Sequence, residues 1–308
     1  MRRTLCCLFI FICSSNIICQ EQPGGRIYKN AIELRHDNDF LLFTDRYYTT
    51  GSFIGWHTLL NTPNKGLDRW QYSLFIQQEL YTPADLLETE IRRFDRPYAG
   101  FLGLTNGLQL TNHRRILDFK VTLGITGPFS GGAGIQEVFH STASNDARIP
   151  VWLGQINTSA FGNLYATYIR EWQWQPNPFS VHFAASPSAT IGNRDIYAQP
   201  EVAFFFGRRD PIGTTSAYNQ LGSIKNEYFF AIRMAYRYVF HNALLEGNLI
   251  GDSSSFLIDP YKNMFLYSFE ANARLKRFNL LIAYNFATPQ TRKTDPHLFM
   301  TFGVTRAF

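Results

Sequence analysis

The chain has 308 residues, of which 45% are hydrophobic and 16% aromatic, and 17% are charged, against about 25% charged residues in typical soluble domains. This composition excludes an intrinsically disordered chain and a coiled coil. Beyond the N-terminus no apolar run reaches the roughly 20 residues that a transmembrane helix needs, and the mean hydropathy is −0.17. The formal net charge of +5 is too small to indicate a nucleic-acid partner. A β-rich protein is therefore favoured.

The N-terminal segment has the organisation of a secretory signal peptide. Arg2 and Arg3 precede an apolar run at 5–13, and a polar break follows. We expect cleavage near Cys19, which leaves 20–308 as one exported domain. All four cysteines lie in the removed segment, so the mature chain has no thiol for a disulfide or a metal. Lipidation of Cys19 is the alternative, although the small residue expected before a lipidated cysteine is absent.

Alternating apolar and polar residues predict long β-strands in the rest of the chain. From Tyr228 to Phe240 the even positions are all apolar, whereas the odd positions include Arg233 and Arg237. Membrane-spanning strands need about 9–11 residues, while soluble strands usually have about 5–6. The last predicted strand ends at Phe308, which resembles the closing strand of bacterial outer-membrane barrels. The predicted strands are 27–38, 48–59, 70–81, 98–111, 115–126, 162–174, 179–192, 195–207, 226–240, 263–275, 276–287 and 297–308.

We interpret these strands as an all-β, antiparallel transmembrane β-barrel of about 12 strands, an even number as in single-chain bacterial barrels. A soluble β-sandwich is the alternative, but its core would have to find a partner for each buried tyrosine hydroxyl. Long connections are expected at 82–96, 127–160, 208–224 and 241–262, with a short helix near 134–140 that places Ile135, Val138 and Phe139 on one side. Charged side chains are expected to fill the interior as paired networks rather than to line a pore. They are Asp118, Lys120, Glu227, Arg233, Arg237, Glu270 and Arg274.

Two groups of polar residues could carry chemistry. Asp37, Asn38 and Asp39 close the first predicted strand and offer the hard oxygen ligands that Ca²⁺ prefers. Such a cluster is more often a turn. His140 lies in a long connection with Gln136 one helical turn before it, and a histidine can serve as a base. Most loop histidines have no such role. Because adjacent residues of a strand point to opposite faces, we expect a bulge or a strand end at Asn38 and Asp39, at the barrel rim.

Five motifs, taken in order, resemble the outer-membrane lipid A deacylase family. They are Asn38-Asp39-Phe40, the segments 45–51 (DRYYTTG), 95–100 (DRPYAG) and 124–128 (GITGP), and Gln136-Glu137-Val138-Phe139-His140. The ordered set is specific, whereas any single motif is not. The resemblance implies a twelve-stranded barrel and a Ca²⁺-dependent hydrolysis that removes the 3'-linked acyloxyacyl group from lipid A.

Carried over residue by residue, the resemblance implies functional positions at Asn38, Asp39, Thr49 and His140, with Asp39 at the metal. It implies a supporting shell of Tyr48, Arg96 and Gln136. One position departs from the family pattern. The characterised enzyme is thought to use a lysine before the segment that matches Asp95-Arg96, and this chain has Arg92 and Arg93 there. Arginine can bind phosphate or stabilise an oxyanion, but it does not simply replace lysine.

The expected function is that of an outer-membrane ester hydrolase acting on lipid A of lipopolysaccharide. His140 would activate water as a general base, and a Ca²⁺ near Asp39 would stabilise the oxyanion. Lipid A and outer-membrane lipids are the expected partners, and a monomer is favoured. One alternative is a non-catalytic, lipid-binding or structural barrel of the same family. Another is an outer-membrane phospholipase in which His140 activates Ser141 or Ser144, but the His-x-Ser-Asn-Gly arrangement of that family is absent.

Overall fold

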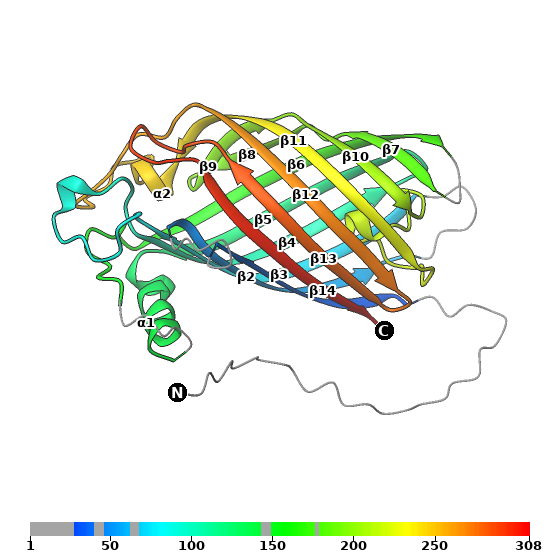
Figure 1. The fold of residues 1–308 in the computed structure, drawn as a ribbon, viewed down its shortest axis with the longest axis horizontal. Coiled ribbons are helices and arrows are strands. Elements are labelled where there is room, and N and C mark those ends of the chain that lie inside the picture. The colour runs from blue at the N-terminus through cyan, green and yellow to red at the C-terminus, as the bar shows by residue number, and fades with distance from the viewer. Residues whose placement is uncertain (1–27, 40–45, 62–67, 143–148, 176–178) are drawn as a thin grey trace, which may run out of the picture.

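The computed structural model describes residues 28–39, 46–61, 68–142, 149–175 and 179–308, so the predicted signal peptide lies outside them. The described strands form one antiparallel sheet that closes on itself (Figure 1). The strands are β1 (Asn30–Asn38), β2 (Tyr47–Leu59), β3 (Arg69–Thr82), β4 (Ala99–Thr111), β5 (Arg115–Thr126), β6 (Ser159–Gln175), β7 (Ser180–Ala185), β8 (Ser188–Gly192), β9 (Asp195–Gln199), β10 (Glu201–Arg208), β11 (Glu227–Asn242), β12 (Asn263–Leu275), β13 (Phe278–Ala287) and β14 (His297–Ala307).

Two interruptions explain why these segments make a twelve-stranded barrel. β7 and β8 both pair with β6, and β9 and β10 both pair with β11, so each pair of segments occupies one strand position. Proline has no N–H to donate to the ladder. The carbonyls of Pro187 and Pro200 still accept from Tyr168 N at 3.0 Å and Tyr236 N at 3.1 Å. The predicted strands 179–192 and 195–207 thus correspond to these two interrupted strands, and the predicted barrel is confirmed.

The two faces of the barrel differ as the sequence pattern predicts. On β11, the Phe230 side chain on the outer face is 67% exposed, whereas Glu227 on the inner face is 0% exposed. Many interior charges are paired. Arg233 Nε lies 2.7 Å from Glu270 Oε1, and Lys120 Nζ lies 3.1 Å from Asp118 Oδ2. Paired charges and polar side chains therefore occupy much of the lumen, as expected.

The connection between β10 and β11 folds into one end of the barrel. Gln71 on β3 donates from Nε2 to the Asn219 carbonyl at 2.8 Å, and Asn219 Nδ2 donates to Glu33 Oε2 on β1 at 2.9 Å. Gln220 Nε2 donates to Gln109 Oε1 on β4 at 2.8 Å. This segment, 209–226, is called the plug below, and it contains a 3-10 helix, η4 (Ser216–Tyr218). Its end of the barrel also holds the C-terminus and the short turn 276–277, so it is the periplasmic end.

The opposite end, called the outer end, carries long connections and short helices (Figure 1). These are α1 (Gly132–Thr142), α2 (Ala243–Glu246) and the 3-10 helices η2 (Ile91–Arg93) and η3 (Pro128–Ser130). Helix α1 includes the short helix expected near 134–140. Among the helices of the described ranges, none has the length and apolarity required to cross a membrane.

Candidate active site

Asn38 and Asp39 lie where β1 ends at the outer end of the barrel. Asn38 Nδ2 donates to Thr50 Oγ1 at 2.8 Å and to the Thr49 carbonyl at 3.3 Å. Asp39 N donates to the same carbonyl at 3.4 Å. The carboxylate of Asp39 is buried, and its Oδ2 accepts from Arg46 N at 2.8 Å. The expected strand end is therefore present at Asn38 and Asp39. Both residues are hydrogen-bonded to the Thr49 carbonyl.

A bulge in β2 presents Thr49. The register against β3 shifts between Tyr48 and Thr50, so Thr49 is the extra residue of the bulge. Its Oγ1 lies 2.8 Å from the hydroxyl of Thr82 at the end of β3, and both side chains are buried. Thr82 was not predicted as a site residue, because nothing in its local sequence shows that β3 ends beside this bulge.

Helix α1 lies against the outside of the barrel wall. Its buried residues are Gly132, Gln136 and His140, spaced four apart along one helix face. On β3, Leu80 lies between two residues that face the lumen, so its own side chain faces outward. A Cβ added to Gly132 would come within 2.8 Å of Leu80 Cδ2, which places this face of α1 on the wall (Figure 1).

Helix α1 reverses the usual pattern of a surface helix, in which apolar residues are buried and polar residues are exposed. Its apolar residues Ile135, Val138 and Phe139 are exposed, while the polar residues Gln136 and His140 are buried. Gln136 Oε1 accepts from Trp152 Nε1 at 2.8 Å. The helix thus directs a histidine and an amide toward the wall and offers apolar side chains to its surroundings.

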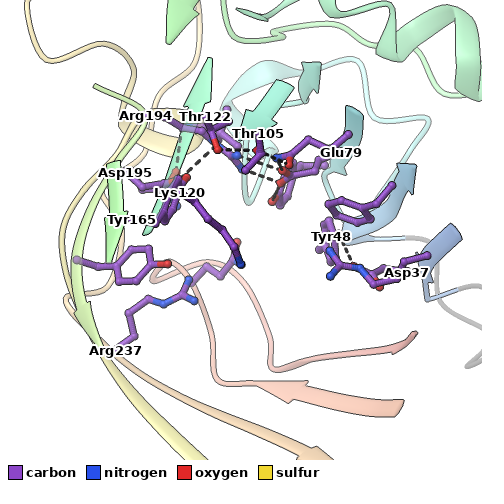
Figure 2. A pocket seen from close by; sticks show the side chains of 18 of the residues that line it. Asp37, Tyr48, Glu79, Thr105, Lys120, Thr122, Tyr165, Arg194, Asp195 and Arg237 are labelled. Carbon is purple, nitrogen blue, oxygen red and sulfur yellow. Dashed lines mark hydrogen bonds and ion pairs between the residues drawn. The ribbon is translucent and has the colours of Figure 1, made fainter. Parts of the chain in front are cut away.

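Two residues of the predicted supporting shell, Tyr48 and Arg96, face the lumen and not the outside of the barrel. Tyr48 and Arg96 line a cavity of about 420 Å³ in the lumen (Figure 2). Tyr48 donates its hydroxyl to Asp37 Oδ2 at 2.8 Å, and Arg96 donates from Nη1 to Gln290 Oε1 at 2.9 Å. Burial lowers the pKa of Arg96 to about 10. Gln136, by contrast, lies with His140 on α1.

The arginines at the family's lysine position point into solvent. Arg92 and Arg93 are exposed on η2, and Arg93 Nε pairs with Glu90 Oε2 at 2.8 Å. Sequence reasoning missed Lys293, from the connection before β14, which lies close to this segment. Its Nζ donates to the carbonyls of Arg92 and Phe94 at 2.9 Å each, so it fastens the segment to the rim.

The phospholipase alternative names two serines, of which the structure describes Ser141. Ser141 is exposed, and its hydroxyl donates to the Val138 carbonyl at 3.1 Å, within its own helix. Ser144 lies outside the described residues.

The donor atoms around Asp39 fit a hard cation. They are its own carboxylate, the Asn38 amide oxygen, and the hydroxyl and carbonyl oxygens of Thr49. The Thr49 carbonyl accepts from both Asn38 Nδ2 and Asp39 N. Oxygen ligands of this kind suit Ca²⁺, whereas zinc prefers nitrogen and sulfur. No group of three or more His, Cys, Asp or Glu side chains forms a metal cluster within the part of the chain that the structure describes. Neutral oxygens would therefore have to supply part of a Ca²⁺ shell here.

The closed antiparallel barrel, with an apolar outer face and a polar lumen, defines the class: this is a bacterial outer-membrane β-barrel. The chain belongs to the family of outer membrane protein LpxR, whose model matches residues 4–308, and this is the lipid A deacylase family that its motifs resemble.

One solved structure agrees on the fold. LpxR from Salmonella typhimurium is 19% identical, with a TM-score of 0.75 over 90% of this chain and 100% of that one. The β domain of the Bordetella autotransporter BrkA is 11% identical, with a TM-score of 0.45 over 92% and 99%. No curated protein matches this chain.

Proposed function

We propose that the protein is a Ca²⁺-dependent ester hydrolase that removes an acyl or acyloxyacyl chain from lipid A. The observation that carries the proposal is the placement of His140 on the buried face of α1, against the outside of the wall at the outer end. Thr49 lies at the same end on β2, next to β3, which α1 contacts, and Asn38 and Asp39 lie one strand further, at the end of β1. A site outside the barrel wall is accessible to a lipid, whereas a site in the lumen is not.

The residue types match the chemistry of ester hydrolysis. His140, as the neutral imidazole, takes a proton from water, and the water oxygen bonds to the ester carbonyl carbon. The bond to the alkoxide then breaks, and the alkoxide takes up the proton. Asp39 would hold Ca²⁺, with Asn38 and Thr49 supplying neutral oxygens or positioning water and substrate. When bound, the ion would neutralise the negative charge that develops on the carbonyl oxygen.

Mass spectrometry of lipid A tests the proposal. Purified protein given lipopolysaccharide and Ca²⁺ should produce lipid A lacking one acyl or acyloxyacyl chain. His140→Ala should reduce this conversion by at least about 100-fold, the usual size of a general-base contribution. His113→Ala is the matched control, because His113 is an exposed histidine in the turn between β4 and β5 at the periplasmic end.

The folding of each variant is checked by its migration on SDS gels with and without heating, which reports the intact barrel. If the unmutated protein leaves lipid A unchanged with Ca²⁺ present, the hydrolase proposal is wrong. A folded barrel that binds lipid A without cleaving it would instead identify the non-catalytic alternative.

A further inference from the structure

Four arginines of the barrel interior follow one rule of charge pairing. Each contacts a carboxylate oxygen at 2.6–2.8 Å. Burying a guanidinium costs free energy unless an anion compensates its charge. The four pairs are Arg194 with Glu79, Arg209 with Glu171, Arg233 with Glu270, and Arg274 with Asp210.

Arg35 and Arg237, which also lie in the barrel interior, depart from this rule, as Arg96 does with its hydrogen bond to the neutral Gln290. Arg35 Nε lies 3.8 Å from Asp37 Oδ1, too far for a hydrogen bond, and its guanidinium lies 3.7 Å from the centre of the Phe53 ring. Arg237 Nε donates to the neutral Gln199 Oε1 at 2.7 Å. Among the described residues, the guanidinium groups of Arg35 and Arg237 donate no hydrogen bond to a carboxylate. Arg233, on the same strand as Arg237, contacts two carboxylates.

Both arginines line the cavity that also holds Tyr48 and Arg96. Its described lining contains five basic and three acidic side chains. The basic residues are Arg35, Arg96, Lys120, Arg194 and Arg237, and the acidic residues are Asp37, Glu79 and Asp195. A neighbouring cavity of about 310 Å³ shares Lys120 but is lined by two described bases and two described acids. Of these two cavities, the first, called the upper cavity below, is the one with an excess of basic side chains.

The cationic side chains approach the upper cavity from different strands. Arg35 is on β1, Lys120 on β5 and Arg237 on β11, and these strands lie far apart around the barrel. Figure 2 shows Lys120 and Arg237 on one side of the cavity and Asp37 with Tyr48 on the other. An anion in this space could thus contact cations from several parts of the wall.

We propose that this cavity binds a small, soluble oxyanion of the phosphate class, held by Arg35 and Arg237, with Lys120 shared between the anion and Asp118, whose Oδ2 lies 3.1 Å from its Nζ. A guanidinium presents a fork of N–H donors that matches two oxygens of a phosphate, and an ammonium adds a point charge. The barrel wall separates the cavity from the membrane, so a soluble anion rather than a lipid headgroup is the expected ligand. The proposal is independent of the hydrolase activity.

Calorimetry of the full-length barrel in detergent tests the proposal. Inorganic phosphate is added to phosphate-free protein at constant ionic strength, which is maintained with sodium chloride. We expect a saturable rise in Tm of about 2–4 °C, and heat of binding in isothermal titration. Arg237→Gln should abolish both responses.

Arg233→Gln is the matched control, because Arg233 lies on the same strand and already pairs with Glu201 and Glu270. This variant should start from a lower Tm but keep the phosphate response. Arg35→Gln gives a second test from another strand and should lose the response. The proposal is overturned if phosphate has no more effect than chloride, or if the folded Arg237→Gln or Arg35→Gln protein responds as the unmutated protein does. A general salting-out effect of phosphate would act equally on all variants.

Discussion

Asp39 shows how a single residue can link the strand ends to the proposed chemistry. It follows the last residue of β1, and the Thr49 carbonyl accepts its N–H across to β2. Asp39 is 0% exposed. The other possible metal ligands next to its carboxylate are neutral oxygens. The carboxylate accepts from Arg46 N, and a charged oxygen ligand beside neutral oxygens suits Ca²⁺, which is why we place the proposed Ca²⁺ there.

Asp39→Asn should therefore change the response to Ca²⁺ more than it changes the fold. The substitution keeps the shape of the side chain but removes the charge that a Ca²⁺ ligand supplies. We expect lipid A deacylation to fall by about 100-fold or more, and the remaining activity to require higher Ca²⁺. A Ca²⁺ titration followed by lipid A mass spectrometry measures both effects. Asp68→Asn, at an exposed carboxylate near the periplasmic end, should have no effect. An unchanged Ca²⁺ dependence in Asp39→Asn would remove Asp39 from the metal site.

At the scale of elements, the contact between α1 and the wall decides where His140 lies. The contact is close because Gly132 has no side chain between the helix and Leu80 or Trp152. Four residues later, Gln136 accepts from the indole of Trp152, and His140 follows after another four. The helix position is therefore fixed near its first turn and in its middle, and the histidine is carried on the same face.

Gly132→Val should displace α1 and reduce activity while leaving the barrel intact. A Cβ at this position would come within 2.8 Å of both Leu80 Cδ2 and Trp152 Cη2, so the helix or these two side chains must shift, and we expect the helix to move because Leu80 is buried. A displacement of about 1 Å can cost about 100-fold in rate. Gly134→Val is the matched control on the same helix, since a Cβ there meets nothing within 4 Å. Deacylation rates and Tm measured side by side give the comparison. Equal rates for the two variants would show that the position of α1 does not matter for activity.

At the scale of the whole molecule, the plug occupies the periplasmic end of the barrel interior. Arg274 on β12 joins the plug to the wall. Its Nη2 lies 2.6 Å from Asp210 Oδ2 and 3.0 Å from Glu227 Oε2, and its Nη1 donates to the Thr214 carbonyl at 2.6 Å. The plug also packs Tyr218 against the buried Phe205 of the wall. Charged and apolar contacts together hold the plug against the wall at the periplasmic end.

Arg274→Ala should open this end of the barrel. Removing one member of a buried ion pair typically costs about 3–5 kcal/mol, because the remaining carboxylates lose their partner. We expect the unmutated protein to show no steady ion conductance in planar bilayers and Arg274→Ala to show conducting events. Arg277→Ala, at an exposed arginine in the adjacent turn, should stay closed. A closed Arg274→Ala barrel would mean that other contacts suffice to hold the plug.

Much of the architecture could be predicted from local sequence. Alternation with a period of two is a property of neighbouring residues, so it identified the strands and the outward face of β11 without knowledge of their partners. The end of β1 at Asn38 followed from the same geometry. Helix α1 was also expected, but not that its polar residues would be the buried ones, because that depends on the wall it meets.

The tertiary structure alone decided which distant residues become neighbours. The segment 208–224 was expected only as a long connection, and its place inside the lumen depends on hydrogen-bond partners from β1, β3 and β4. Arg233 and Arg237 look equivalent in the sequence. Closure of the barrel places Glu201 and Glu270 beside Arg233 but the neutral Gln199 beside Arg237. The sequence by itself determined the strands and the identity of the interior charges. Their pairing was decided by the register in which the sheet closes, since Coulomb and hydrogen-bond partners act through space and not along the chain.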